Sequence, residues 1–156
     1  MVALNTIIRP AEIADIPVLI ELRLAQMQSM RRHDPESLAR LAAATEVYLR
    51  EHLPGGSFRA WLIEMDGQAV ATGGLVIRQA PPTYNNLSGR EGYLMALYTR
   101  PEFRRRGLAT AILRAILDQL RAEGITRVTL RASPDGRPLY ESLGFEATPE
   151  MKLRLA

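Results

Sequence analysis

The sequence predicts an α/β fold in which one mixed β-sheet carries helices on both of its faces. Segments with strand character and segments with helical periodicity follow one another in the order β-α-α-β-β-β-α-β-α-β, which is typical of layered α/β proteins. An Asp66-Gly67 pair separates two apolar segments, and this is a strong signal for a β-hairpin. No repeat, low-complexity tract or linker interrupts the 156 residues, so we expect a single domain over residues 1–156.

The first half of the chain is expected to contain a strand, two helices and the β-hairpin. Asp15 can cap a first helix that has Pro17 in its first turn. That helix should end before Asp34-Pro35, because a residue that precedes proline avoids the helical region, and the same pair suits the start of a second helix. The expected ranges are a strand at 5–9, helices at 15–33 and 34–53, and strands at 58–65 and 68–78.

The second half of the chain begins with a polar loop at 79–90, which contains two prolines and two asparagines. An amphipathic helix is expected at 104–123, because leucine and isoleucine recur along one face and Gly124 is a favourable terminator. The remaining expected elements are strands at 91–99 and 126–132, a helix at 135–143 and a final strand within 145–155.

The composition is that of an ordinary soluble protein, with 47% hydrophobic and 24% charged residues. No apolar run is long enough to span a bilayer, so we expect no membrane partner. The N-terminal residues contain no basic stretch followed by an apolar one, which predicts the absence of a secretory signal and a cytoplasmic location.

Cysteine content and net charge limit the kinds of site and ligand that the chain can have. The chain has no cysteine, which excludes disulfides, thiolate metal sites and a cysteine-linked acyl intermediate, and we predict no metal. The net charge is +3, but aromatic residues make up only 6% of the chain and do not interleave with the basic residues. This pattern does not favour a nucleic-acid partner, whereas a modest positive charge suits a polyanionic small ligand.

A basic, glycine-containing segment lies at the expected start of the long helix: Arg104-Arg105-Arg106-Gly107-Leu108-Ala109. A helix N-terminus offers unsatisfied N–H groups, glycine lets an anion approach the backbone, and arginine donates charge-assisted hydrogen bonds to phosphate. The segment therefore predicts a pyrophosphate site, with a solvated basic turn as the alternative. The sequence lacks Gly-Lys-Ser/Thr and Gly-x-Gly-x-x-Gly, which argues against an NTPase or a dinucleotide enzyme.

A second motif lies downstream, where Leu139-Tyr140 is followed by Gly144-Phe145. The first motif contributes Arg104, Gly107 and Ala109, and the start of the chain contributes Ile8-Arg9-Pro10-Ala11 and Asp15. With these residues in place, the sequence resembles the GNAT N-acetyltransferase superfamily over nearly the whole chain. Each motif alone is short, but both stand in the right order on a matching series of elements.

The resemblance implies that acetyl-CoA is the co-substrate and lies where the strands at 91–99 and 126–132 diverge. It implies that the main chain of the first strand binds the pantetheine arm, that the basic segment holds the pyrophosphate, and that Tyr140 is the general acid that protonates the departing thiolate. The residues assigned to acetyl-CoA in this way are Leu97, Tyr98, Thr99, Arg104, Arg105, Arg106, Gly107, Leu108, Ala109, Thr110 and Ser133.

The general base and the acceptor are less defined. Many relatives carry a glutamate where this sequence has Tyr93, so Glu91, which shares a strand face with Tyr93, is the carboxylate candidate, and a chain of water molecules is the alternative. The resemblance implies a primary amine of a small molecule or peptide as the acceptor, in a pocket built from residues 27–37 and 79–93. Relatives often form homodimers, which is an open option for this chain.

The expected function is therefore an N-acetyltransferase in which the amine attacks acetyl-CoA directly in a ternary complex. The alternative is an acyl-CoA-binding sensor or partner module with the same fold and little transferase activity. The departure from the usual pattern at Tyr93 favours the alternative, whereas Tyr140 and the basic segment favour the enzyme.

Overall fold

The computed structural model describes residues 5–156, so residues 1–4, on which the expectation about a secretory signal partly rests, lie outside it. One five-stranded sheet has the strand order β1-β2-β3-β4-β5, in which β4 and β5 are parallel and the other neighbours are antiparallel. The strands are β1 (Thr6–Pro10), β2 (Phe58–Met65), β3 (Gln68–Gln79), β4 (Arg90–Thr99) and β5 (Val128–Leu130).

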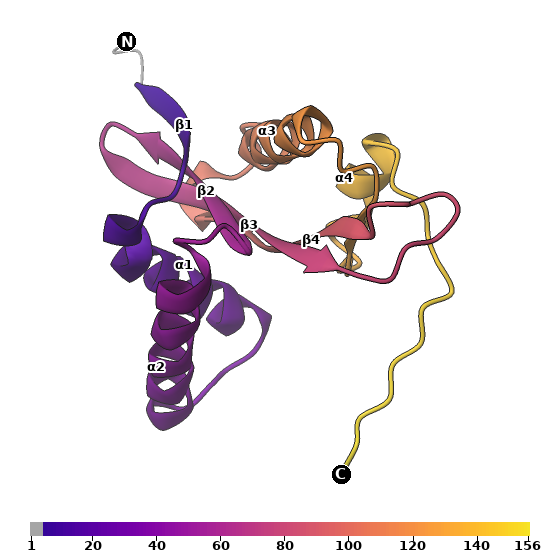
Figure 1. Cartoon of the computed structure of the whole chain (residues 1–156). Coiled ribbons are helices and arrows are strands. Elements are labelled where there is room, and N and C mark those ends of the chain that lie inside the picture. The colour runs from indigo at the N-terminus through magenta and orange to yellow at the C-terminus, as the bar shows by residue number, and fades with distance from the viewer. Residues whose placement is uncertain (1–4) are drawn as a thin grey trace.

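Helices cover both faces of this sheet (Figure 1). They are α1 (Ile16–Met30), α2 (Pro35–His52), α3 (Leu108–Ala122) and α4 (Arg137–Ser142), with 3-10 turns at Ile13–Asp15 and Pro101–Phe103. Alternate residues of β2 pack on opposite sides: Ile63 lies in the core beneath α3, and Leu62 lies in the core beneath α1 and α2. The α/β fold class expected from the sequence is confirmed. None of the helices within residues 5–156 is both long and apolar enough to cross a membrane.

The long helix begins later than the sequence predicted. The expected start was residue 104, but α3 begins at Leu108. Arg105 and Gly107 adopt φ values of +62° and +75°, which lie in the left-handed region and cannot continue a right-handed helix. Residues 104–107 therefore form a loop that leads into the first turn of α3.

The final strand expected within residues 145–155 is not formed, and this part of the prediction is wrong. Residues 143–156 contain no helix or strand, and the segment runs away from the sheet (Figure 1). The alternating pattern is present, but a strand also needs backbone hydrogen bonds to a neighbouring strand, and the tail pairs with none of the five strands of the described residues. β5 is likewise shorter than expected, with three residues in place of 126–132.

An ion pair links the start of β2 with the end of α3. The Arg59 guanidinium binds both carboxylate oxygens of Glu123, with Nη2 at 2.9 Å from Oε1. The guanidinium lowers the pKa of Glu123 from 4.5 to about 2. Because the folded-state pKa is below the unfolded one, the pair stabilises the fold above about pH 4.5 and this stability is lost as the pH falls toward about 2.

We expect Glu123→Gln to lower the free energy of unfolding by about 1 to 2 kcal/mol near neutral pH, because it removes a bidentate hydrogen-bonded charge pair. Urea denaturation should show this difference shrinking as the pH falls from about 4.5 toward about 2. Asp118→Asn is the control, since the Asp118–Arg121 pair is 75% and 70% exposed and should contribute little. A Glu123→Gln deficit that stays constant down to about pH 2 would contradict the role of this ion pair.

Candidate functional site

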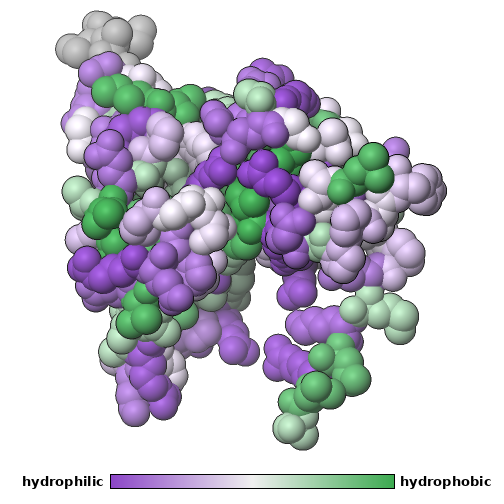
Figure 2. Space-filling model, in the orientation of Figure 1, coloured by the Kyte–Doolittle hydropathy of each residue, from purple (hydrophilic) through white to green (hydrophobic). Residues whose placement is uncertain are grey.

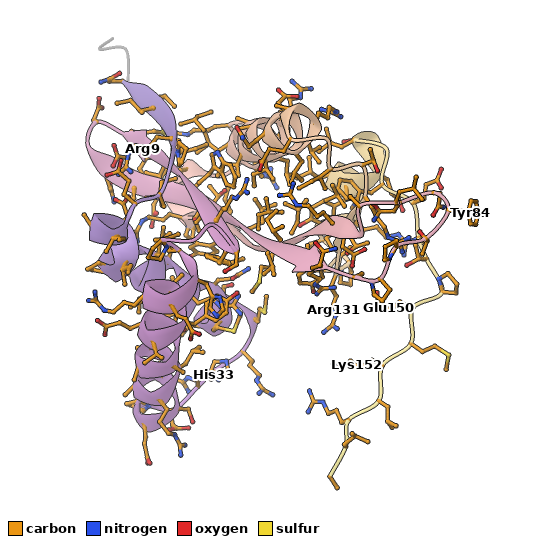
Figure 3. All side chains as sticks on the ribbon, in the orientation of Figure 1. Arg9, His33, Tyr84, Arg131, Glu150 and Lys152 are labelled. Carbon is orange, nitrogen blue, oxygen red and sulfur yellow. The ribbon has the colours of Figure 1, made fainter. Side chains whose placement is uncertain are left out.

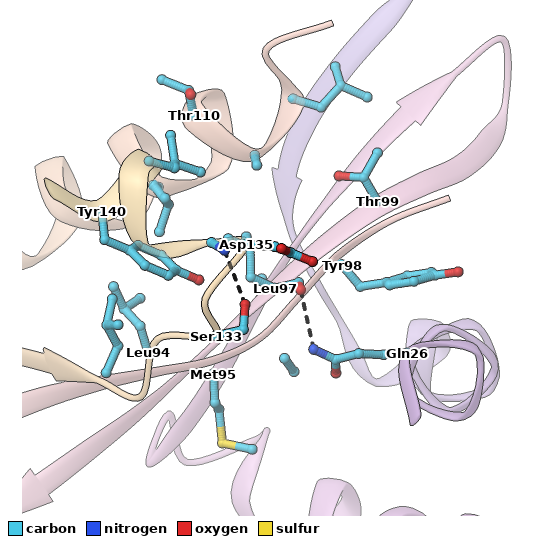
Figure 4. A pocket seen from close by; sticks show the side chains of 18 of the residues that line it. Gln26, Leu94, Met95, Leu97, Tyr98, Thr99, Thr110, Ser133, Asp135 and Tyr140 are labelled. Carbon is cyan, nitrogen blue, oxygen red and sulfur yellow. Dashed lines mark hydrogen bonds between the residues drawn. The ribbon is translucent and has the colours of Figure 1, made fainter. Parts of the chain in front are cut away.

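A cleft opens where β4 and β5 separate. The two strands pair only over Gly92–Leu94 and Val128–Leu130. β4 then continues to Thr99, and no strand of the described residues 5–156 pairs with it on that side. A cavity of about 830 Å³ fills this gap and is bordered by the end of α1, the start of α3 and α4 (Figure 4). The cleft therefore exposes main-chain groups of β4 beside a helix N-terminus, as the sequence predicted.

A β-bulge shapes the β4 wall of this cleft. The pairing of β3 with β4 skips a residue, so that Ala96 and Leu97 together oppose Gly73. Ala96 takes up the irregularity with a φ of +54°. A bulge bends its strand and re-aims the groups next to it, and here it directs the Leu97 main chain toward the cleft and α1.

Helix α1 provides a contact to this bulge from a residue that the sequence analysis did not identify. Gln26 of α1 donates from Nε2 to the Leu97 carbonyl oxygen at 3.2 Å (Figure 4). Arg23, one turn earlier, donates from Nη1 to Gln26 Oε1 at 2.9 Å. The Gln26 amide is therefore oriented by Arg23, so that its NH₂ group points at the bulge. No local sequence signal could identify Gln26, because its partner lies 71 residues away.

If the chain catalyses the acetyl transfer that the sequence predicts, we expect Gln26→Leu to lower kcat about 10-fold while leaving the fold intact. The substitution keeps the side chain's size but removes the hydrogen bond that holds the bulge, and small displacements at a reacting centre have large effects on rate. Gln28→Leu is the matched control, because it is the same substitution in the same helix at an exposed residue that does not line the cleft. Steady-state kinetics of the two variants measure this difference. Equal rates for both variants would mean that the Gln26 hydrogen bond only attaches α1 to the sheet.

The end of the cleft where the sequence predicted a pyrophosphate site is formed by the 104–107 loop and the first turn of α3. Gly107 is the N-cap residue, and within residues 5–156 no side chain caps the first-turn N–H groups. Arg104 and Arg105 line the cleft, and Arg104 Nε is anchored on Thr99 O at 3.0 Å. The N–H groups of this turn, the positive end of the helix dipole, and the residues Arg104 and Arg105 thus border the same part of the cleft, which suits a pyrophosphate.

Most of the residues assigned to acetyl-CoA from the sequence meet in this cleft, and one does not. The lining includes Leu97, Tyr98, Thr99, Arg104, Arg105, Gly107, Leu108, Ala109, Thr110 and Ser133. Arg106 is absent from it. The Arg106 guanidinium instead lies 5.3 Å from the centre of the Phe103 ring and bonds to Glu102 O at 3.4 Å.

Tyr140 projects from α4 into the cleft (Figure 4). Its ring packs edge-on against Phe145 with a centroid distance of 5.9 Å. The residue is half-buried, and this burial raises the pKa of the phenol above 10. Ser133 lies next to it and accepts a hydrogen bond from Gly136 N at 3.1 Å, which secures the start of α4.

The carboxylate candidate from the sequence is not brought to the cleft. Glu91 forms an ion pair with Arg127, with Oε2 at 3.3 Å from Nε, and it does not line the cavity. Tyr93 also lies outside the cleft, with its ring 4.0 Å from the Arg78 guanidinium. Among the lining residues of the described chain, Asp135 is the single carboxylate and no histidine occurs.

The expected acceptor pocket is present only in part. In the first expected segment, residues 27–37, Ser29 and Met30 line the cleft. Gln26, which lies just before this segment, lines it too. His33 lies in the connection between α1 and α2 (Figure 3) and does not reach the lining. No residue of 79–93 lines the cavity either, because residues 80–89 fold into a compact turn that is closed by the Ala80 N to Gly89 O hydrogen bond of 2.8 Å.

Comparison with known proteins explains this arrangement. The model of the acetyltransferase (GNAT) family matches residues 20–145 of the chain. The chain belongs to the GNAT family of acetyltransferases. A GCN5-related N-acetyltransferase from Ralstonia eutropha JMP134 has 29% identity and a TM-score of 0.87, with 97% of this chain and 99% of that chain covered.

Two further GNAT relatives bear on the site. The crystal structure of a predicted acetyltransferase with acetyl-CoA from Clostridium acetobutylicum shares 30% identity, covers 97% of this chain and 96% of that chain, and has a TM-score of 0.85. The N-acetyltransferase family 8 member 2 of Rattus norvegicus is 33% identical over 135 residues, which are 83% of this chain and 55% of that protein. The chain spans about half the length of that relative.

Proposed function

We propose that this GNAT protein, as a single domain over residues 1–156, transfers the acetyl group of acetyl-CoA to a primary amine of a small molecule or peptide. The observation that carries the proposal is the uncapped N-terminus of α3, with Arg104 and Arg105 beside it, at one end of the cleft. The acetyl-CoA in the similar Clostridium structure supports the same ligand for this cleft.

In the proposed reaction the amine attacks the acetyl carbonyl directly in a ternary complex. The main chain of β4 from Leu97 to Thr99, which has no strand partner on the cleft side, supplies the polar groups that bind the pantetheine arm and polarise the carbonyl. The C–S bond of the thioester then breaks, and the thiolate takes its proton from Tyr140, whose raised pKa keeps the phenol protonated at neutral pH.

Water is the proposed acceptor of the amine proton. Glu91 is occupied by Arg127 outside the cleft, and the one lining carboxylate, Asp135, is solvent-exposed. An amine of lysine type has a pKa near 10.4, so the transfer rate should rise with pH until the acceptor is largely neutral. The chemistry uses no metal, and a cytoplasmic location suits it because that compartment supplies acetyl-CoA.

A second candidate is an acyl-CoA-binding module with little transferase activity, favoured by the lack of a buried carboxylate at the cleft. Both candidates predict saturable acetyl-CoA binding, which isothermal titration calorimetry measures. Release of free thiol from acetyl-CoA in the presence of a panel of amino acids, polyamines, aminoglycosides and peptides then separates them. Binding without amine-dependent thiol release identifies the binding module, and absence of binding refutes both candidates.

A further inference from the structure

Helix α1 carries an arginine beside the cleft that has no acidic partner. Arg23 is half-buried, and its one hydrogen bond within residues 5–156 runs from Nη1 to Gln26 Oε1 at 2.9 Å. None of the ion pairs of these residues includes Arg23, and burial lowers the pKa of its guanidinium. A half-buried cation without a counter-charge costs free energy, which a bound anion would offset.

The remaining N–H groups of Arg23 are open to solvent. No side-chain nitrogen or oxygen of the described residues is both fully buried and without a hydrogen-bond partner. Nε and Nη2 of Arg23 have no partner there, so both atoms are accessible to water or to a ligand. They lie on the same edge of the guanidinium, and such a pair of donors matches two oxygens of a carboxylate or a phosphate.

The acidic residues of α1 and of the connection from α1 to α2 already have partners. Glu21 of α1 binds Arg100, with Oε1 at 2.8 Å from Nη2. Asp34 caps α2 and accepts hydrogen bonds from Ser37 N at 2.9 Å and from Ser37 Oγ at 2.7 Å. Neither carboxylate is therefore free to pair with Arg23.

Basic residues also predominate along the cleft itself. Figure 2 shows hydrophilic residues on both borders of the hollow between the part of the molecule with α1 and α2, on the left, and the part with α4, on the right. Among the lining residues of the described chain, Arg104, Arg105 and Arg131 are basic, and the exposed Asp135 is the one acidic residue. Such a surface attracts anionic ligands and disfavours cationic ones.

We propose that Arg23 binds an anionic group of the acceptor, so that the acceptor is a primary amine that also carries a carboxylate or a phosphate. This inference rests on the proposed acetyl transfer and names the class of its acceptor. The Gln26 amide alone separates Arg23 from the Leu97 carbonyl oxygen of the bulge (Figure 4). An anion on Arg23 is thus one side chain away from the main chain that is proposed to bind the acetyl group.

An acceptor of this class is held at one end and reacts at the other. The guanidinium binds the anion, and the amine at the other end of the molecule is directed toward the cleft beside β4. Holding the acceptor in this way orients its nitrogen for attack and removes part of the entropy cost of the reaction. Polyamines and aminoglycosides carry cationic groups and no anionic one, so they lack the group that Arg23 would bind.

Arg23 has a structural role as well, because it orients the Gln26 amide. A purely structural arginine would affect all amine acceptors alike, since every transfer would use the same bulge at Leu97. An arginine that also binds the acceptor affects only those acceptors that carry an anionic group. Pairs of acceptors that differ only in this group therefore separate the two roles.

The first test compares β-alanine, γ-aminobutyrate and δ-aminovalerate with their carboxamides, and adds aminoethyl phosphate as the phosphate probe. Nuclear magnetic resonance titration of the isotope-labelled protein, with and without CoA, measures binding without turnover. At least one anionic amine should bind about 10-fold to 100-fold more tightly than the carboxamides, which is the range of a charge-assisted hydrogen bond. Tighter binding of aminoethyl phosphate than of the three acids would assign phosphate as the anion. Equal affinities for acids and carboxamides with no preference for the phosphate, or no binding of any anionic amine, overturn the proposal.

The second test removes the charge. Arg23→Gln should lower the affinity for the preferred anionic amine about 10-fold to 100-fold and leave the affinity for the carboxamides unchanged, whereas Arg23→Lys keeps the charge and should restore part of the preference. Arg114→Gln is the matched control, because Arg114 is exposed on α3 and does not line the cleft. A preference that survives in Arg23→Gln, or an equal loss in Arg114→Gln, overturns the proposal.

The same compounds distinguish a failure of this proposal from a failure of the proposed function. Binding of the anionic amines that is lost in Arg23→Gln, without release of thiol from acetyl-CoA, supports the anion site and refutes the transferase. Thiol release that is as fast with carboxamides and polyamines as with the anionic amines supports the transferase and overturns the anion site.

Discussion

Gly107→Asp should weaken acetyl-CoA binding about 100-fold, equivalent to about 2.7 kcal/mol. Gly107 is the N-cap of α3 and adopts a φ of +75°, and a Cβ placed there meets nothing within 4 Å. The new side chain therefore meets no neighbouring atom, although the left-handed backbone disfavours it, and it places a carboxylate at the helix N-terminus where the pyrophosphate is expected. Repulsion between like charges at this distance, together with loss of the free N–H donors, explains the magnitude.

Two further variants separate charge from backbone strain in a calorimetric titration. Gly107→Asn has the same shape without the charge, and asparagine tolerates the left-handed region, so its affinity should fall only a few-fold. Gly124→Asp introduces the same charge at the other end of α3, where φ is +73° and a Cβ also meets nothing within 4 Å. It should bind acetyl-CoA normally, and equal losses for Gly107→Asp and Gly124→Asp would show that the effect is not local to the phosphate end.

Tyr140→Phe should reduce kcat about 100-fold and change the affinity for acetyl-CoA only a few-fold. General acid catalysis contributes about 100-fold to 10,000-fold, and phenylalanine keeps the ring that packs against Phe145. Tyr98→Phe is the matched control, because Tyr98 also lines the cleft but is assigned a role through its main chain. An unchanged kcat for Tyr140→Phe would mean that the phenol only packs in the cleft.

The pH dependence of the transfer rate distinguishes a general acid at Tyr140 from a side chain that only packs in the cleft. A general acid works only while it is protonated, and burial raises the pKa of Tyr140 above 10. The wild-type rate should therefore rise as the acceptor amine loses its proton and fall again only above about pH 10. In Tyr140→Phe the fall at high pH should disappear, and this limb can be measured with single-turnover rates of thiol release.

Elements with strong local signals were predicted well. β2 occupies the range 58–65 that its apolar run indicated. The Asp34 side chain caps α2 through Ser37 N at 2.9 Å, as the Asp34-Pro35 pair suggested. Local signals also located the basic segment before α3, but the helical pattern could not show that the backbone turns left-handed at Arg105 and Gly107. The start of α3 was consequently placed too early.

The sequence by itself determined the fold class, the family, and the place of the basic segment before α3 and of Tyr140 on α4, because these depend on short-range periodicity, capping and two motifs of fixed spacing. Only the tertiary structure decided the contacts that join distant segments. Gln26 meets the bulge at Leu97 because α1 lies across the sheet. Glu91 lies outside the cleft because it precedes the part of β4 that pairs with β5, and its carboxylate binds Arg127 there. The alternating tail has strand character, but it forms no strand because it pairs with none of the strands of the described residues.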